Sequence, residues 1–257
     1  MLRHLAAIAL LGALFTSGPA TAAPRPVVER PITIVLDPGH GGQNHGCAAA
    51  GNDVEEKEVT LWIAAELQAE LAQRLPHAKI VLTREADRSM TLAERVSIAN
   101  AAEADVFVSI HANASDTKTQ HGFETYVLDA RASSMEAART AMRENAGTAG
   151  RAKADAEAAT MVRQLQLLAH RERAARLAQT IQQAQAERFP DRFDRGVKQA
   201  PFDVLMGAQM PAVLFEAGFL DHAQESSTLI DKDARAKVVD GLADALVDFY
   251  RQQGRDG

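Results

Sequence analysis

Short apolar, β-branched runs alternate with amphipathic helical segments along this chain, and this alternation restricts the fold more than any other feature. The clearest runs are ITIVL at 32–36, KIVL at 79–82 and VFVSI at 106–110. Such runs are typical of strands buried on both faces of a sheet. Helical spacing of apolar residues appears at 56–75 and again at 234–250. The sequence therefore predicts a single α/β domain with a mixed, mostly parallel sheet and helices on both faces.

Local signals add further elements to this outline. Thr91 and Glu94 stand three residues apart, which is the spacing of a capping box and predicts that a helix begins there. The alternating segment FETYVL at 123–128 predicts a strand nearer an edge of the sheet. Two more apolar runs, at 202–205 and 212–215, are strand candidates close to the C-terminal helix.

The segment 130–188 differs from the rest because it carries almost no strand signal. It is rich in alanine, glutamate, glutamine and arginine and contains no proline. We expect a first helix over 133–145, a break at Gly147 and Gly150, and a long helix over 155–188. This segment is therefore interpreted as a helical insertion in the domain.

The first residues have the pattern of a secretory signal peptide. The apolar run LAAIALLGALF at 5–15 is followed by small residues at 20–23. It is too short to cross a bilayer, which needs roughly 20 apolar residues. We expect a signal peptide at 1–23, a leader at 24–30, and a domain over 31–254 that has no membrane span and is exported.

Charge and cysteine content exclude other classes of protein. The formal net charge is −6 with 24% charged residues, whereas nucleic-acid binding favours a clearly basic surface. No nucleic-acid partner is therefore expected. Cys47 is the only cysteine, so the exported chain cannot form an internal disulfide, and we expect a monomer.

Residues suited to metal chemistry follow the predicted strands. His40 stands in a glycine-rich loop just after the first strand, His111 ends the strand that begins at 106, and Glu216 follows the run at 212–215. In open α/β sheets, ligands bind at the carboxyl ends of the strands. The pair Glu55 and Glu56 begins the first long helix and offers another carboxylate near the same edge.

These residue types are those of a catalytic zinc site. Two histidines and one carboxylate commonly hold zinc and leave one position for water. A further carboxylate beside the water can accept its proton and pass it to a leaving nitrogen. The residues alone do not decide between Glu55 and Glu56 as the ligand. Cys47 has no CxxC partner and is expected to be a small packed residue.

Eight motifs occur in family order over nearly all of 31–250 outside the helical insertion. They are DPGHGG at 37–42, EKEVTLWIA at 56–64, TREAD at 83–87, LAERVSIAN at 92–100, ADVFVSIHAN at 104–113, GFETYVL at 122–128, RGVKQAPFDVL at 195–205 and PAVLFEAGFLDH at 211–222. With this ordered set the chain resembles the zinc-dependent N-acetylmuramoyl-L-alanine amidases of the Amidase_3 type. The resemblance implies hydrolysis of the amide bond between the lactyl group of N-acetylmuramic acid and L-alanine in peptidoglycan.

The resemblance also assigns roles to the candidate residues. In the family the ligand glutamate directly precedes a lysine, which implies Glu56 and not Glu55. His40, Glu56 and His111 are then the expected ligands of Zn²⁺, and Glu216 is the expected catalytic glutamate. Four polar residues match recurrent family positions and are expected mainly to support the structure: Arg84, Arg95, Asn100 and Asn113.

The insertion at 130–188 resembles one in the division-associated amidases of Gram-negative bacteria. In those proteins a helix covers the zinc site until an activator with a LytM-type domain displaces it. The stretch AMREN at 141–145 resembles the part whose glutamate plugs the metal, so Glu144 is a candidate autoinhibitory ligand. This resemblance implies a periplasmic protein that splits septal cell wall and has a LytM-domain activator. The alternative is that 130–188 is only a longer pair of surface helices.

Two other functions remain open at this point. A zinc carboxypeptidase that cuts within the stem peptide would use the same site chemistry. A non-catalytic homologue that binds the cell wall would be expected to lack a ligand or the base, whereas this chain has all four groups. The mass of the reaction products distinguishes these functions.

Overall fold

The computed structural model describes residues 31–146 and 161–253, with side chains described outside 161–169 and 253. The predicted signal peptide and leader lie outside the described residues, as does 147–160 within the predicted insertion. Within the described part of the chain, no helix is long and apolar enough to cross a membrane.

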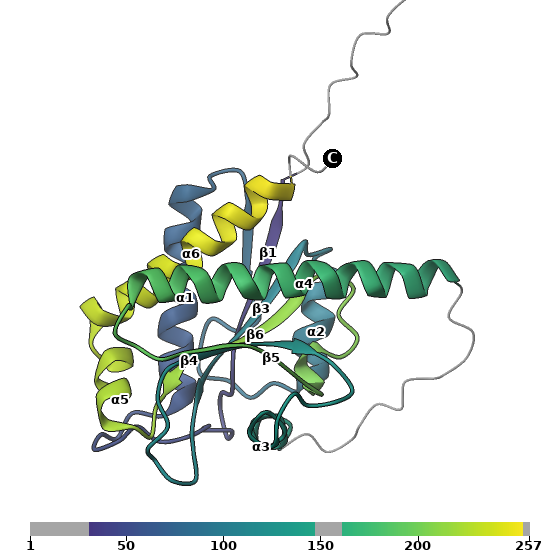
Figure 1. Ribbon diagram of the computed structural model, residues 1–257. Coiled ribbons are helices and arrows are strands. Elements are labelled where there is room, and N and C mark those ends of the chain that lie inside the picture. The colour runs from purple at the N-terminus through teal and green to yellow at the C-terminus, as the bar shows by residue number, and fades with distance from the viewer. Residues whose placement is uncertain (1–30, 147–160, 254–257) are drawn as a thin grey trace, which may run out of the picture. The chain divides into compact units, whose positions relative to one another are not determined.

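One six-stranded sheet, in the order β2-β1-β3-β6-β4-β5, forms the centre of the fold (Figure 1). Its strands are β1 Thr33–Pro38, β2 Lys79–Leu82, β3 Val106–Asn113, β4 Phe123–Leu128, β5 Asp194–Ala200 and β6 Ala212–Phe219. All neighbouring strands are parallel except β4 and β6, which pair antiparallel. The predicted fold class, a mixed and mostly parallel α/β sheet, is therefore confirmed.

Helices cover both faces of this sheet. One face packs against α1 (Glu56–Arg74), α4 (Met161–Arg188) and α6 (Lys232–Gln253). The other packs against α2 (Leu92–Ala101), α3 (Met135–Glu144) and the 3₁₀ helix η1 (Asp203–Leu205). The short helix α5 (Ala223–Ile230) contacts β6 and α6.

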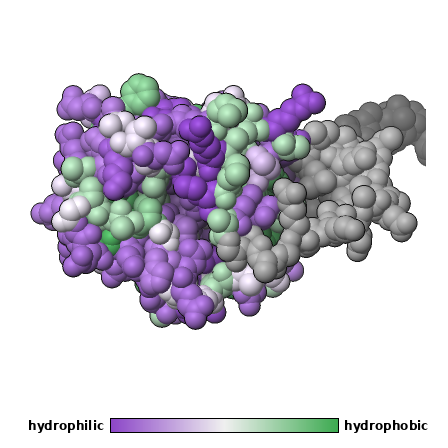
Figure 2. Space-filling model, turned by 90° about the horizontal axis from the view of Figure 1, so that it is seen from below, coloured by the Kyte–Doolittle hydropathy of each residue, from purple (hydrophilic) through white to green (hydrophobic). Residues whose placement is uncertain are grey.

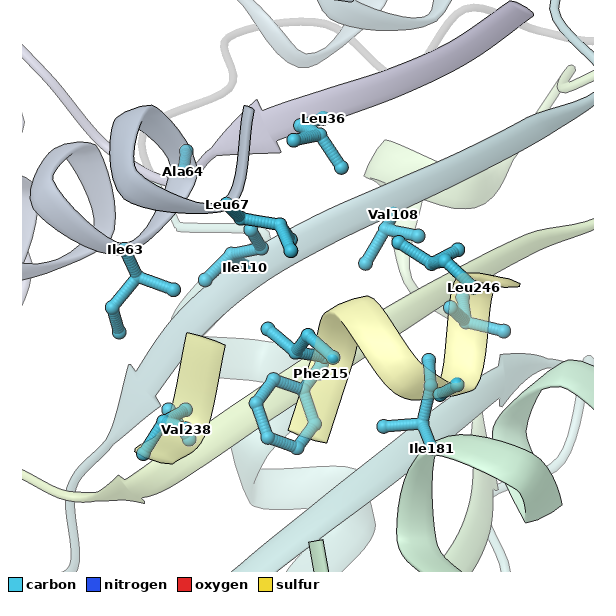
Figure 3. Close-up of a cluster of buried hydrophobic side chains, with 14 of the residues drawn as sticks. Leu36, Ile63, Ala64, Leu67, Val108, Ile110, Ile181, Phe215, Val238 and Leu246 are labelled. Carbon is cyan, nitrogen blue, oxygen red and sulfur yellow. The ribbon is translucent and has the colours of Figure 1, made fainter. Parts of the chain in front are cut away.

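Alternate residues of the central strands form the two hydrophobic cores. Figure 3 shows the larger core, in which Leu36, Val108 and Phe215 of the sheet face apolar side chains of α1, α4 and α6. The intervening residues, such as Phe107 and Leu214, face the other way into the second core. Both faces of the strands are thus buried, which explains why they read as continuous apolar runs in the sequence.

The predicted element at 202–205 is wrong in type, because these residues form η1 and its N-cap and not a strand. Phe202 and Leu205 are buried, and the backbone amide of Asp203 donates to the side chain of Asn145, which stabilises the start of this turn.

Strand β5 and helix α5 were not predicted. Residues 194–200 (DRGVKQA) lack apolar alternation, because β5 is an edge strand with mainly charged and small side chains.

Most other elements lie within a few residues of their predicted ranges. Helix α2 begins after Thr91, whose hydroxyl accepts from the amide of Glu94 while the Glu94 carboxylate accepts from the Thr91 amide. The predicted capping box is therefore confirmed. Strand β4 lies one position in from the edge strand β5.

Replacing Leu67 with alanine should lower the free energy of unfolding by about 2–5 kcal/mol, because the side chain is fully buried between α1 and the sheet. Urea denaturation measures this loss. The exposed Gln73, on the same helix, provides the matched control, and Gln73→Ala should change stability by less than about 0.5 kcal/mol. Equal effects of the two substitutions would contradict the packing described.

Candidate metal centre

The loop after β1 holds His40 in an unusual backbone conformation. His40 has φ 59°, in the left-handed region that residues other than glycine seldom adopt. Two buried arginines bind the carbonyl oxygens of this loop. Arg84 donates to Pro38 and Gly39 at 3.0 and 2.7 Å, and Arg95 donates to Pro38 and His40 at 2.6 and 2.5 Å. These bonds stabilise a backbone conformation that costs of order 1–3 kcal/mol by itself.

Asp37 balances the charge that the arginines bring into the interior. Its carboxylate accepts from Arg95 at 2.8 Å, from Thr83 at 2.5 Å and from Ser109 at 2.8 Å. Burial opposes ionisation of Asp37, but the charge of Arg95 and these hydrogen bonds outweigh it, so its pKa lies below the usual value. Burial and the nearby Arg95 lower the pKa of Arg84 to about 10, which still leaves it charged at neutral pH.

Glu56, the first residue of α1, points its carboxylate at the end of β3. The amide of Ala112 donates to Oε1 and the amide of Cys47 donates to Oε2, each at 3.0 Å. Its neighbour Glu55 lies outside the helix as the N-cap, where it forms a capping box with Glu58. The sequence did not decide between these two glutamates as the ligand. In the structure only Glu56 faces His40 and His111, whereas Glu55 contacts His45.

The two imidazoles converge from the ends of β1 and β3. Their ring centroids are 4.9 Å apart. The Nδ1 atom of His40 pairs with Asn44 Oδ1 at 3.0 Å, which leaves Nε2 directed at the shared centre. A Cβ atom on Gly39 would lie only 2.4 Å from the ring of His111, so this position requires glycine. The sequence motif DPGHGG therefore contributes both a candidate ligand, His40, and the space for the ring of a second, His111.

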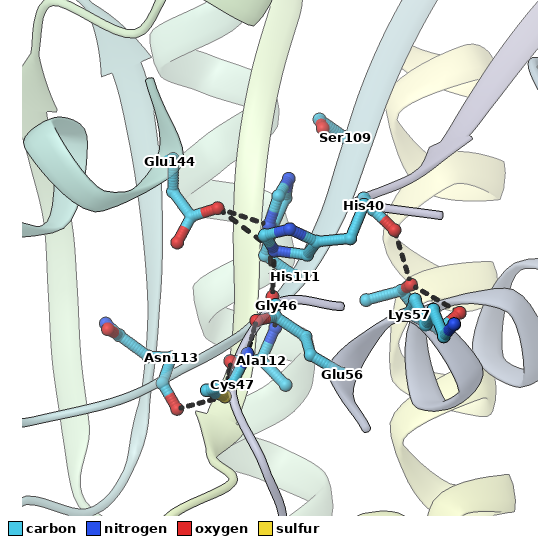
Figure 4. A network of polar contacts seen from close by, with 12 residues as sticks. His40, Gly46, Cys47, Glu56, Lys57, Ser109, His111, Ala112, Asn113 and Glu144 are labelled. Carbon is cyan, nitrogen blue, oxygen red and sulfur yellow. Dashed lines mark hydrogen bonds and ion pairs between the residues drawn. The ribbon is translucent and has the colours of Figure 1, made fainter. Parts of the chain in front are cut away.

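Four side chains meet at one point, as Figure 4 shows. His40 Nε2 lies 2.9 Å from Glu56 Oε1 and 3.2 Å from Glu144 Oε2. His111 Nδ1 lies 3.1 Å from Glu56 Oε1 and 2.9 Å from Glu144 Oε2. Ligands about 2.0–2.1 Å from a tetrahedral zinc ion would be about 3.3 Å from one another. The spacing and the donor atoms therefore fit a divalent ion such as zinc.

Buried polar atoms at this point support the fit. His40 Nε2 and Glu144 Oε2 are shielded from solvent and form no hydrogen bond. Burial favours a neutral His111, but the charge and close contact of Glu144, together with a hydrogen bond to Glu56, raise its pKa to about 10. Burial likewise opposes ionisation of Glu144, yet His111 and His40 lower its pKa to about 2. The site thus concentrates negative charge beside two imidazoles, which a divalent cation would neutralise.

Glu216 lies on β6 beside this group but does not belong to it. It is paired in register with His111 of β3 on one side and with Glu124 of β4 on the other. The side chain is fully buried, and neither carboxylate oxygen makes a hydrogen bond. Burial, followed by the charges of Glu144 and Glu56, raises the pKa of Glu216 well above its usual value. Such a group favours the protonated form and can exchange a proton with a neighbour.

The C-terminal end of α3 is fixed over the four-residue group. Glu144 is its last residue, and the adjacent Arg143 donates to Asn113 Oδ1 at 2.6 Å. The next residue, Asn145, donates to the carbonyl of Pro201 at 2.9 Å and accepts from the amide of Asp203 at 2.9 Å. These contacts hold the carboxylate of Glu144 against both imidazoles.

The structure brings together the candidates His40, Glu56, His111 and Glu144 and places Glu216 in the adjacent strand. Cys47 is outside this group, and its thiol donates to the carbonyl of Ala112 at 3.2 Å. Sequence reasoning missed three charged residues beside the site, which are the buried Glu124 and the partly buried Arg195 and Lys198. The motifs GFETYVL and RGVKQAPFDVL contained them, but nothing in their spacing indicated that they meet.

Comparison with known proteins identifies the family. Residues 34–248 match the Amidase_3 family model, described as N-acetylmuramoyl-L-alanine amidase. The amidase LytC of Bacillus subtilis is 35% identical over 219 residues, covering 85% of this chain and 36% of LytC. The probable amidase AmiB of Haemophilus influenzae is 32% identical over 234 residues, covering 87% of this chain and 53% of AmiB. The chain thus spans about a third to a half of the length of these two relatives.

Solved structures show the same fold. The catalytic domain of the amidase CwlV from Bacillus (Paenibacillus) polymyxa var. colistinus superposes with a TM-score of 0.66 at 27% identity, covering 86% of this chain and 98% of that domain. An N-acetylmuramoyl-L-alanine amidase of Clostridium difficile 630 gives a TM-score of 0.67 at 27% identity, with the same coverage of both chains.

Replacing Asp37 with alanine should lower the free energy of unfolding by about 3–5 kcal/mol, because the charge of Arg95 would remain buried without its carboxylate. Urea denaturation in the presence of a chelator measures this loss without a contribution from bound metal. In the double variant Asp37→Ala, Arg95→Met, the loss of unfolding free energy divided by the number of charges removed should be smaller. The reason is that no unpaired charge remains buried. An Asp37→Ala protein as stable as the parent would contradict this role.

Proposed function

The chain belongs to the Amidase_3 family of N-acetylmuramoyl-L-alanine amidases, and we propose that it hydrolyses the amide bond between the lactyl group of N-acetylmuramic acid and L-alanine in peptidoglycan. The observation that carries this proposal is the convergence of His40, Glu56 and His111, whose candidate ligand atoms lie within 4.8 Å of one another. Glu216, on the neighbouring strand, supplies the additional carboxylate that amide hydrolysis needs.

We assign the metal site to three of the four converging residues. Nε2 of His40, Nδ1 of His111 and the carboxylate of Glu56 would hold Zn²⁺. When bound, zinc supplies a water of lowered pKa and polarises the scissile carbonyl. The amides of Ala112 and Cys47 keep the Glu56 carboxylate oriented, and the bond between His40 and Asn44 fixes which ring nitrogen faces the ion.

Glu216 is the proposed general base. Its buried carboxylate has no hydrogen bonds that would compete for a proton. The charge of Glu144 helps to raise its pKa, so departure of Glu144 and the charge of a bound cation would both favour the ionised form that a base needs. A carboxylate in such surroundings accepts the proton of the attacking water at one oxygen and donates it to the L-alanine nitrogen as the amide bond breaks. Because Glu216 is fully buried, the proton it carries is not readily exchanged with bulk solvent before it is transferred.

Glu144 is the proposed autoinhibitory ligand, and the helical insertion at 130–188 is the proposed regulatory segment. Its Oε2 atom lies where a water or the substrate carbonyl would have to bind, 2.9 Å from His111 Nδ1. Because Arg143 and Asn145 fix this end of α3, catalysis requires that the helix move away. We assign that displacement to an activator protein with a LytM-type domain.

The substrate places the proposed activity outside the cytoplasm. Residues 1–23 would act as the signal peptide and 31–254 as the catalytic domain, and the insertion favours a periplasmic enzyme of septal cell-wall splitting. A carboxypeptidase that cuts within the stem peptide would instead release single amino acids. Mass spectrometry of digested sacculi separates the two, because an amidase yields a free lactyl end and an intact peptide that begins with L-alanine.

Replacing Glu216 with glutamine should reduce turnover by about 10²–10⁴-fold, because the isosteric amide cannot accept the proton. Zinc content, measured by elemental analysis, should stay the same, since Glu216 is outside the metal-binding group. Turnover should be followed on purified sacculi with the activator present or with α3 detached by a second substitution. Undiminished turnover would show that another residue is the base.

Replacing Glu144 with alanine should raise basal activity on purified peptidoglycan at least about tenfold, because the fourth position at the metal becomes free. Met142 is 74% exposed on the same helix, so Met142→Ala is the matched control and should leave basal activity unchanged. Equal activity of the Glu144→Ala variant and the parent would argue that 130–188 is an ordinary surface helix pair.

A further inference from the structure

A second charged cluster lies under α3, on strands β4 and β5 next to Glu216. Glu124 on β4 is fully buried, and its Oε2 atom accepts from Arg195 Nε at 2.7 Å and from Lys198 Nζ at 2.5 Å. Both cations come from β5. The carboxylate of Glu136, on the first turn of α3, approaches the same two cations from the side of the helix.

All hydrogen-bond acceptor positions of the Glu124 carboxylate are occupied. Its Oε1 atom accepts from Asn113 Nδ2 at 2.8 Å and from the hydroxyl of Tyr126 at 2.5 Å, while Oε2 accepts from the two cations. A carboxylate offers about four acceptor sites, so none remains for other donors. Two positive charges thus face one buried negative charge, and a second anion is needed for balance.

Glu136 provides this second anion in the present structure. Its Oε1 atom pairs with Arg195 Nη2, and its Oε2 atom lies 3.5 Å from Lys198 Nζ. One carboxylate oxygen therefore faces each cation. This two-point arrangement is a geometry in which proteins bind carboxylates selectively.

The two cations are held in place without Glu136. The Arg195 guanidinium lies 4.9 Å from the ring centroid of Phe219 and donates to the carbonyl of His121 at 3.3 Å, besides its bond to Glu124. Lys198 is held by Glu124. With α3 in place, the side chains of Arg195 and Lys198 are 11% and 15% exposed, and their bonds to Glu124 do not depend on the helix. Removal of α3 would leave a preorganised cationic site.

Hollows border α3 on both sides. One is a cavity of about 470 Å³ lined by His40, His111 and Glu144, and the other is a cavity of about 370 Å³ lined by Glu136 and Arg143. Figure 2 looks onto the side of the molecule where α3 lies and shows a narrow hydrophobic strip across a largely hydrophilic surface. Helix α3 therefore lies between two hollows, and both of its glutamates point toward the sheet, Glu144 largely buried at 8% side-chain exposure and Glu136 partly exposed at 35%.

The distance between the two glutamates of α3 sets the size of a ligand that could replace them. Glu136 and Glu144 are eight residues apart, which is about 12 Å along a helix. An extended peptide covers about 3.3–3.6 Å per residue. A chain with its scissile amide at the metal would therefore bring its third or fourth residue to Arg195 and Lys198.

We propose that Arg195 and Lys198 bind a carboxylate of the peptidoglycan stem peptide, and that Glu136 fills this subsite while α3 is in place. This inference rests on the proposed substrate. Helix α3 then imitates the substrate at two points, with Glu144 at the metal and Glu136 at the carboxylate subsite. Substrates whose stem carboxylates are converted to carboxamides should bind less tightly, because a neutral amide cannot replace the charge of Glu136.

Binding of the released peptide tests this inference without any need for catalysis. The probes are a synthetic stem peptide that begins with L-alanine and has free side-chain and C-terminal carboxylates, and the same peptide with carboxamides. Isothermal titration calorimetry compares the full chain with its Glu136→Gln variant, both carrying Glu144→Ala so that α3 is released from the metal site. In Glu136→Gln the carboxylate form should bind at least about tenfold more tightly than the carboxamide form, the value expected for one charge-assisted contact. In the parent chain, Glu136 should block this preference.

Two variants complete the experiment. Glu172→Gln changes an exposed glutamate on α4 and should behave like the parent chain. Glu136→Gln combined with Lys198→Met should lose the preference for the carboxylate, with an unchanged circular dichroism spectrum showing that the fold is kept. Equal affinity of the two peptides for Glu136→Gln, or a preference that survives Lys198→Met, would overturn the subsite. Failure of the proposed hydrolysis would appear separately, in the digestion of sacculi.

Discussion

The binding of the loop after β1 by two buried arginines is the constraint on which the rest of the site depends. Arg84 and Arg95 bind three consecutive carbonyl oxygens of this loop, and this stabilises the left-handed conformation of His40. Arg95 can be buried because Asp37 pairs with it. The proposed ligand His40 is thus positioned by buried charged side chains beneath its loop, and Gly39 leaves room for the ring of His111.

Much of the fold and the converging ligands could be predicted from the sequence, because they follow from local pattern and topology. Continuous apolar strands imply a sheet covered on both faces, and parallel strands deliver the residues at their ends to one edge. The residues alone left Glu55 and Glu56 equal, and only the family resemblance favoured Glu56; in the structure, the backbone amides of Ala112 and Cys47 orient its carboxylate. Strand β5 was missed because its charged residues are buried only through their pairing with Glu124, a contact between segments distant in sequence.

Helix α3 connects the proposed autoinhibition by Glu144 with the proposed carboxylate subsite that Glu136 fills. The helix contacts the sheet through small buried residues, including Ala137 and Ala141, and through two carboxylates that reach opposite ends of the site. Burial of small apolar residues stabilises the packing of α3 only weakly, so the charged contacts at its two ends contribute much of the free energy that keeps α3 on the sheet. If α3 is the regulatory segment proposed above, a substrate or partner that supplies carboxylates at the same two points could displace it.

Anomalous X-ray scattering at the zinc edge, from crystals of the purified protein, tests the central claim most directly. The account predicts one strong peak about 2.0–2.2 Å from His40 Nε2, His111 Nδ1 and a carboxylate oxygen of Glu56. Glu216 should stand beside the peak without touching it. A peak bound by other residues, or a well-ordered crystal in which Glu56 points away from both imidazoles, would contradict the account.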